Sequence, residues 1–154
     1  MKAFSPRIFA AAALGLGFGF AILPVAADSH LMTVFKDPSC GCCSAWAQEM
    51  EKIGYQIKIV NLEDMSQVKR QAGIPEALEG CHTAVLGDYI LEGHVPVQAL
   101  NKLLQEQPDI RGISTPGMPT GSLGMGYDAN AEYTVYAFYS DPAQNPTPFY
   151  QAGK

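Results

Sequence analysis

Apolar and polar residues alternate in two short segments, residues 31–36 and 55–60. Both segments are rich in β-branched, aromatic and long apolar residues, and this combination predicts half-buried β-strands. Between them, apolar residues recur at helical spacing over residues 44–53, and Gly54 is suited to end that helix. The first part of the chain therefore predicts a strand, a helix and a second strand, which together make a βαβ unit.

A second helix, a hairpin and a third helix are predicted next. Residues 65–72 indicate a short helix, and the segments 83–86 and 89–92 flank Gly87-Asp88, a two-residue hairpin signal. Pro96 is suited to the first position of a helix whose apolar residues again recur at helical spacing. The order β-α-β-α-β-β-α predicts an α/β, thioredoxin-like domain with a mixed sheet flanked by helices.

The remainder of the chain follows a different pattern. Residues 108–130 are rich in Gly and Pro and show no periodicity, so they predict a long loop. Residues 132–139 predict one extra C-terminal strand, and the proline-containing stretch after them is expected to be extended or loosely attached. Residues 28–154 are expected to form a single domain, in keeping with their length.

Residues 1–27 have the three-part pattern of a secretory signal peptide. Lys2 and Arg7 supply the positive segment, an apolar run follows, and Val25 and Ala27 are small residues at the −3 and −1 positions of a cleavage site. The alternative is a permanent membrane anchor, because the apolar run is just long enough to cross a bilayer. The small residues at its end favour cleavage, and export leads to a compartment where disulfides are allowed.

Composition and charge exclude several classes of function. The formal net charge is −5 at pH 7, with 10 Lys and Arg against 15 Asp and Glu; removing Lys2 and Arg7 would leave 8 against 15, or −7. An acidic domain of this kind argues against nucleic acid as a partner and, after signal cleavage, against a membrane. The chain also lacks G-x-S-x-G, H-E-x-x-H and a phosphate-binding loop, so hydrolase functions are disfavoured.

The sharpest chemical feature is the sequence Cys40-Gly41-Cys42-Cys43, between the first predicted strand and helix. Backbone N–H groups and the helix dipole at such a position stabilise thiolates. Cys40 and Cys43 alone form a C-x-x-C pair, which would make them the catalytic residues of a metal-free thiol–disulfide oxidoreductase. Cys42 complicates this interpretation, because a third thiol in the same turn would compete for the mixed disulfide.

Cys81 comes just before the third predicted strand, where a thioredoxin-like fold would bring it beside the C-x-x-C turn. Four soft thiolates in one place suit Cu(I). Because Cu(I) prefers two or three ligands, four close sulfur atoms would bridge several copper ions. Two structural disulfides and a tetrahedral zinc site remain open as alternatives, although Cys81 has no second Cys near it, as zinc sites usually do.

Further donors to a soft metal are expected from one histidine and two methionines. His94 lies at a predicted strand end, and Met118 and Met125 lie in the Gly- and Pro-rich loop. Imidazole and thioether both suit copper. The alternatives are a hydrogen-bonded turn histidine and methionines that cover the core. His82 directly follows Cys81 and is also a candidate copper ligand; the alternative is a strand residue that alternation turns away from that thiol.

Four motifs, in this order, resemble the CopG-type copper-resistance proteins, a family long carried as a domain of unknown function. They are Asp37-Pro38-Ser39-Cys40-Gly41-Cys42-Cys43, Cys81-His82-Thr83-Ala84, Glu92-Gly93-His94-Val95-Pro96, and Pro116-Gly117-Met118-Pro119 with Gly121-Ser122 and Gly124-Met125. The resemblance covers about residues 31–126. It departs at Leu123, where the family commonly has Pro.

The resemblance implies a thioredoxin-like protein in the periplasm of Gram-negative bacteria. It implies copper binding through the four cysteines, with His94, Met118 and Met125 at recurring family positions. It also implies interconversion or buffering of Cu(I) and Cu(II) during copper stress. We therefore expect a periplasmic copper-binding protein of copper resistance, with copper ions and other periplasmic or efflux copper proteins as partners. A passive chaperone that delivers copper to an efflux system is a further alternative.

Overall fold

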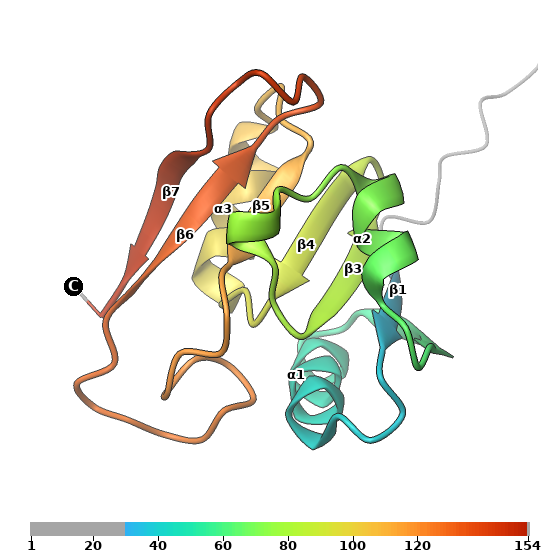
Figure 1. Cartoon of the computed structure of the whole chain (residues 1–154). Helices are drawn as coiled ribbons and strands as arrows, with labels where there is room; N and C mark the ends of the chain where they lie inside the picture. The colour runs from blue at the N-terminus through green and yellow to red at the C-terminus, as the bar shows by residue number, and fades with distance from the viewer. Residues whose placement is uncertain (1–29, 154) are drawn as a thin grey trace, which may run out of the picture.

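The hydrophobic periodicity produces the predicted elements in the predicted order (Figure 1). The computed structural model describes residues 30–153. Its first seven strands and helices are β1 (Leu31–Lys36), α1 (Gly41–Lys52), β2 (Gln56–Asn61), α2 (Ser66–Ala72), β3 (His82–Leu86), β4 (Tyr89–Gly93) and α3 (Val97–Glu106). A short 3₁₀ helix, η1 (Glu76–Leu78), lies between α2 and β3. The predicted signal peptide lies outside the described residues.

One mixed sheet of seven strands has the order β2-β1-β3-β4-β5-β6-β7. β1 runs parallel to β2, and β3 runs antiparallel to both β1 and β4. The last three strands are β5 (Gly112–Thr115), β6 (Tyr133–Phe138) and β7 (Thr147–Ala152). β5 is parallel to β4, and β6 and β7 follow antiparallel. The thioredoxin-like α/β fold is confirmed, with the sheet extended beyond β4.

This extension corrects two expectations. Residues 112–115 form a strand inside the segment predicted as loop, and residues 147–152 are extended, as one of the two expectations had it, but are attached as the edge strand β7. All four residues of β5 are buried, so their sequence shows no alternation. Pro148 is accommodated because β7 has only one neighbouring strand, and an edge strand tolerates a residue without an N–H donor.

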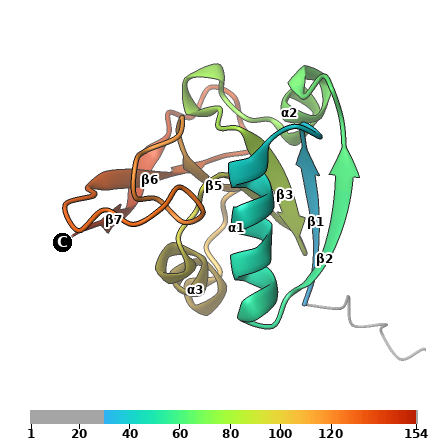
Figure 2. The same cartoon turned by 90° about the horizontal axis from the view of Figure 1, so that it is seen from below.

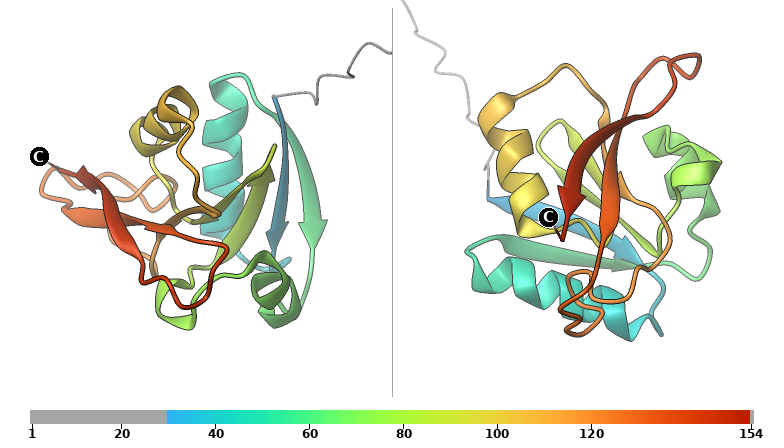
Figure 3. Two further views of the ribbon diagram at one scale, coloured as in Figure 1. Left: turned by 90° about the horizontal axis from the view of Figure 1, so that it is seen from above. Right: turned by 90° about the vertical axis from the view of Figure 1, so that its left-hand side faces the viewer.

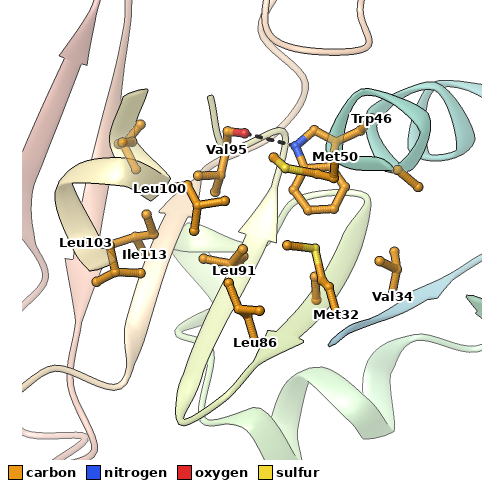
Figure 4. Packing of buried hydrophobic residues seen from close by; sticks show 14 residues of the cluster. Met32, Val34, Trp46, Met50, Leu86, Leu91, Val95, Leu100, Leu103 and Ile113 are labelled. Atoms are coloured by element: carbon orange, nitrogen blue, oxygen red, sulfur yellow. Dashed lines mark hydrogen bonds between the residues drawn. The ribbon is translucent and has the colours of Figure 1, made fainter. Parts of the chain in front are cut away.

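The helices cover both faces of the sheet (Figures 2 and 3). On one face, Trp46 and Met50 of α1 and Leu100 and Leu103 of α3 pack on inward-facing strand residues such as Met32. Figure 4 shows this cluster, in which the Trp46 indole N–H donates to the carbonyl of Val95 over 2.9 Å. A smaller cluster joins residues of α2 and η1 to β4 and β6 on the opposite face. No helix within residues 30–153 is long and apolar enough to cross a membrane.

Candidate metal centre

The cysteine-rich turn begins α1. Cys40 is the N-cap of this helix, and its Sγ accepts a hydrogen bond from the Cys43 backbone N–H over 3.3 Å. This cap lets the helix begin at Gly41, three residues before the predicted start. Cys40 and Cys43 are joined by a disulfide, while Cys42 has a free thiol 3.5 Å from Cys40 Sγ. The C-x-x-C pair predicted from spacing is therefore close enough to bond.

Cys81 joins this turn from the loop before β3. Its carbonyl oxygen lies 3.7 Å from Cys43 Sγ, and its own thiol is free. The sulfur atoms of Cys40, Cys42, Cys43 and Cys81 all lie within 4.8 Å of one another. The predicted gathering of four cysteines is therefore present, with one disulfide instead of the two that the structural alternative required.

A buried ion pair holds the residue that precedes Cys81. The Glu92 carboxylate, fully buried on β4, pairs with Lys69 of α2 and accepts hydrogen bonds from Gly80 N–H over 2.7 Å and Thr83 Oγ1 over 2.6 Å. Lys69 Nζ in turn donates to the Gly80 carbonyl over 3.0 Å. Both polar backbone groups of Gly80 are thus fixed by this pair, which helps to hold Cys81 in its place in the loop.

Two glycines let the backbones behind the site meet directly. A Cβ on Gly80 would lie 2.6 Å from Gly93 Cα, and a Cβ on Gly93, where φ is +68°, would collide with the Thr115 carbonyl oxygen. The residues that follow these glycines in sequence are Cys81 and His94. The close approach therefore places the thiol and the imidazole side by side.

His94 is oriented by a loop on its other side. Its Nδ1 lies 2.7 Å from the Leu123 carbonyl oxygen, which can only accept, so Nδ1 carries the proton. Nε2 therefore presents a lone pair, and it lies 2.9 Å from Cys81 Sγ. Burial, followed by the proximity of Cys42, raises the pKa of Cys81 to about 12, and burial lowers the pKa of His94. In the absence of metal, Cys81 thus donates its thiol proton to a neutral imidazole.

His82 does not turn away from Cys81. Its ring is fully buried and packs at a tilt against Trp46 with centroids 4.4 Å apart. Its Nδ1 lies 3.5 Å from Cys81 Sγ. Strand alternation does not apply to this pair, because β3 begins at His82 and Cys81 belongs to the preceding loop. The imidazoles of His82 and His94 meet edge to face, with centroids 5.1 Å apart.

The methionine-bearing loop crosses beside the cysteines. Gly117 pairs with Gly80 as an isolated bridge, so Met118 follows a residue next to the Cys81 loop, yet its side chain is 57% exposed. Gly124, where φ is +84°, packs so closely on α1 that a Cβ would lie 2.7 Å from Trp46 N and 3.0 Å from the Cys42 carbonyl oxygen. Met125 follows it and is half-buried. The backbone thus brings both methionines to the region of the cysteines.

Two solved structures are similar to this chain over most of its length. Both are described as copper resistance protein CopG, one as Form 1 and one as Form 2. Form 1 matches with 31% identity and a TM-score of 0.74, covering 82% of this chain and 100% of that one. The chain belongs to the CopG family of copper resistance proteins. Form 2 matches with 33% identity and a TM-score of 0.71, covering 79% of this chain and 96% of that one.

A family model described as a protein of unknown function, DUF411, matches residues 78–125 of this CopG-family chain. That segment contains Cys81, His82 and His94 and most of the methionine-bearing loop. No curated protein matches the chain. The resemblance inferred from the four motifs is therefore confirmed at the level of the family.

Three charged residues near this CopG-type site were not predicted from the sequence. Lys69 and Glu92 are 23 positions apart and meet only through the fold. Lys36 is buried at the end of β1, where its ammonium donates to the Asp37 carbonyl over 2.8 Å. A signal for Lys36 was present, because it continues the inward alternation of Met32 and Val34 along the strand. A cation at an inward position indicates a polar site at that strand end.

The donor set fits copper. Sulfur atoms from four cysteines within 4.8 Å of one another supply soft ligands, and His94 Nε2 adds a borderline nitrogen. The bond from His94 Nδ1 to the Leu123 carbonyl is the type of support that metal-bound imidazoles usually have. Reduction of the Cys40–Cys43 disulfide would make all four thiolates available.

The buried His82 predicts an acid-sensitive fold. Burial lowers the pKa of His82 to about 3, helped by His94 and by the ammonium groups of Lys69 and Lys36. Since the unfolded imidazole titrates near 6.5, the unfolded chain binds a proton that the folded chain excludes between pH 6.5 and 3. Stability should therefore fall with pH in that window, by about 2 kcal/mol from pH 7 to pH 5 for this group alone.

Urea unfolding of the metal-free protein at pH 7 and pH 5 measures this effect. In His82→Phe, which keeps a ring against Trp46, the difference between the two pH values should shrink by about 2 kcal/mol. The lowered pKa of His94 contributes in the same direction and remains in the variant. An unchanged pH dependence in His82→Phe would contradict the assignment.

Proposed function

We propose that this protein is a periplasmic copper-binding protein of copper resistance whose cargo is Cu(I), held by Cys40, Cys42, Cys43 and Cys81. The observation that carries the proposal is the gathering of their four sulfur atoms within 4.8 Å of one another. Because Cu(I) prefers two or three soft ligands, four sulfurs at this spacing favour several bridged ions over one. The copper resistance proteins to which the chain is similar support copper as the metal.

Three further side chains complete the proposed copper shell. His94 presents its Nε2 lone pair to Cys81, and the loop that supports this imidazole carries Met118 and Met125. Thioethers are soft donors that do not form disulfides, so they suit an exported copper site. The exposure of Met118 fits a ligand that meets copper as it enters.

The C-x-x-C pair gives the site a source of electrons. In the proposed step, two Cu(II) ions each accept one electron, the thiols of Cys40 and Cys43 release two protons, and an S–S bond forms between them. The disulfide in the structure corresponds to the product of that step. Cys42 and Cys81 remain free to hold the Cu(I) that results. A passive chaperone would transfer copper without forming this bond.

The location and partners are proposed from the leader and the copper chemistry together. Residues 1–27 supply an export signal, and a periplasmic site that binds Cu(I) would receive copper from, or deliver it to, other periplasmic copper proteins or an efflux system. The acidic balance of the chain favours cationic partners over nucleic acid or anionic lipid.

Anaerobic copper titration tests the proposal. The protein lacking residues 1–27 is fully reduced and titrated with Cu(I) in the presence of a chromogenic Cu(I) chelator. We expect more than one Cu(I) per chain, with all four thiols protected from alkylation. Fewer than one Cu(I) per chain, with four thiols intact, would contradict a multinuclear thiolate site. Metal-free reduction of insulin, abolished by Cys40→Ser, would instead favour a thiol–disulfide oxidoreductase.

A further inference from the structure

A second group of metal-binding side chains shares one member with the four cysteines. Cys81, His82 and His94 each offer a ligand atom, and these atoms lie within 4.8 Å of one another. Two nitrogens and one sulfur make a harder donor set than four sulfurs, and His₂Cys is a set that accommodates Cu(II) and other divalent ions. The two groups therefore differ in the oxidation state of copper that they favour.

The geometry around Cys81 suits one ion. Its Sγ lies 2.9 Å from His94 Nε2 and 3.5 Å from His82 Nδ1. A tetrahedral ion with bonds of about 2.3 Å to sulfur and 2.0 Å to nitrogen would separate these atoms by about 3.5 Å. The contact with His82 already has that separation, and the contact with His94 must open from 2.9 Å to about 3.5 Å. The metal would take the place of the thiol proton that Cys81 gives to His94.

His82 offers Nδ1 to this group. Nδ1 lies 3.5 Å from Cys81 Sγ, and the other ring nitrogen, Nε2, is buried without a hydrogen-bond partner within residues 30–153. With the proton on Nε2, Nδ1 keeps a lone pair on the side of the ring that faces Cys81. A neutral imidazole nitrogen with a free lone pair is a good ligand for copper.

Each of the three side chains is held in place from outside the group. The Lys69–Glu92 pair fixes Gly80 and so Cys81. Trp46 packs against the ring of His82, and the Leu123 carbonyl orients His94. Metal sites require this kind of external support. None of these contacts involves the sulfur atoms of Cys40 or Cys43, so the group is complete while that pair is bonded as a disulfide.

We propose that Cys81, His82 and His94 form a second metal site, for a single Cu(II) or similar divalent ion, which stays available when the Cys40–Cys43 disulfide removes two thiolates from the first. The choice of copper rests on the proposed function. The site itself does not, because it requires neither Cu(I) nor the other three cysteines.

Cobalt(II) is a suitable probe, because it does not oxidise thiols and its colour reports thiolate ligation. The experiment uses Cys42→Ser in its Cys40–Cys43 disulfide form, which leaves Cys81 as the free thiol. We expect one Co(II) per chain, with tetrahedral visible bands and a sulfur-to-cobalt charge-transfer band. Adding Cys81→Ser should abolish these bands, and adding His82→Phe should weaken binding at least tenfold. His30→Ala, at the opposite end of β1, is the matched histidine control and should have no effect.

Two results would overturn the site: no binding of Co(II), or binding that is unchanged by His82→Phe. Far-UV circular dichroism checks folding, and Cys40→Ser/Cys42→Ser/Cys43→Ser provides a second background if the first variant does not fold. Trp46 is the only tryptophan of the chain and packs against His82, so Cu(II) at this site should quench its fluorescence, and His82→Phe should reduce that quenching. Loss of Cu(I) stoichiometry in the reduced wild type, with Co(II) binding intact, would reject the proposed function and leave this site standing.

Discussion

Glu92→Ala is expected to lower the free energy of unfolding by about 3–5 kcal/mol, because it leaves the Lys69 ammonium buried without its anion. The substitution also removes the acceptor for Gly80 N–H and for the Thr83 hydroxyl. Burial raises the pKa of Glu92, and the hydrogen bonds from Lys69, Thr83 and Gly80 oppose that rise. Chemical unfolding of the metal-free protein at pH 7 measures the loss.

Two matched variants separate charge from hydrogen bonding. Glu92→Gln keeps an oxygen acceptor for Gly80 and Thr83 and should lose less stability than Glu92→Ala. The double variant Lys69→Met/Glu92→Met removes both charges and should recover part of the loss, since a buried ion pair is often replaceable by apolar residues. If Glu92→Ala lowered the free energy of unfolding by less than about 1 kcal/mol, the ion pair would not be what fixes Gly80.

Cys81→Ser is expected to have the largest effect on metal binding among the four cysteine substitutions. Cys81 belongs both to the four-sulfur group and to the group with His82 and His94. Loss of an outer-shell partner alone typically costs 10–100-fold in metal affinity, so loss of this shared ligand should weaken Cu(I) binding by about 100-fold or more. Competition with a chromogenic Cu(I) chelator, under anaerobic reducing conditions, measures the change.

Cys42→Ser is the matched control for this prediction. It removes one sulfur from the first group and leaves the second intact. It should therefore weaken Cu(I) binding less than Cys81→Ser and should preserve Co(II) binding in the disulfide form. An equal loss of Cu(I) affinity in the two variants would contradict the role of Cys81 as a ligand shared by both groups.

The sequence predicted the elements whose periodicity is local. Strand β1 and helix α1 were predicted because their apolar positions recur at distinct spacings, although α1 begins earlier through the Cys40 cap. Strand β5 was missed, because four consecutive buried residues next to Gly and Pro have no alternation. Strand β7 was missed because its Pro148 indicates a break, and only its edge position makes that proline acceptable.

The cysteine cluster could be predicted from the topology that these elements imply. A βαβ unit places the C-x-x-C turn at one end of the sheet, and the loop before β3 returns to that end with Cys81. The role of His82 was left open, since the boundary between loop and strand at Cys81 depends on pairing that a single sequence does not reveal. The Lys69–Glu92 pair depends on how α2 docks against β4, which tertiary packing alone determines.

The direct meeting of Gly80, Gly93 and the Thr115 carbonyl also bears on how this chain tolerates mutation. No side chain lies between these backbones, so no rotamer change can absorb a larger residue at either glycine. An added methyl group would push apart the segments that carry Cys81 and His94. Gly80 and Gly93 bind no metal, yet substitution at these two positions is as restricted as at Cys81 and His94 beside them. The two proposed ligands can change position during evolution only if both backbones move together.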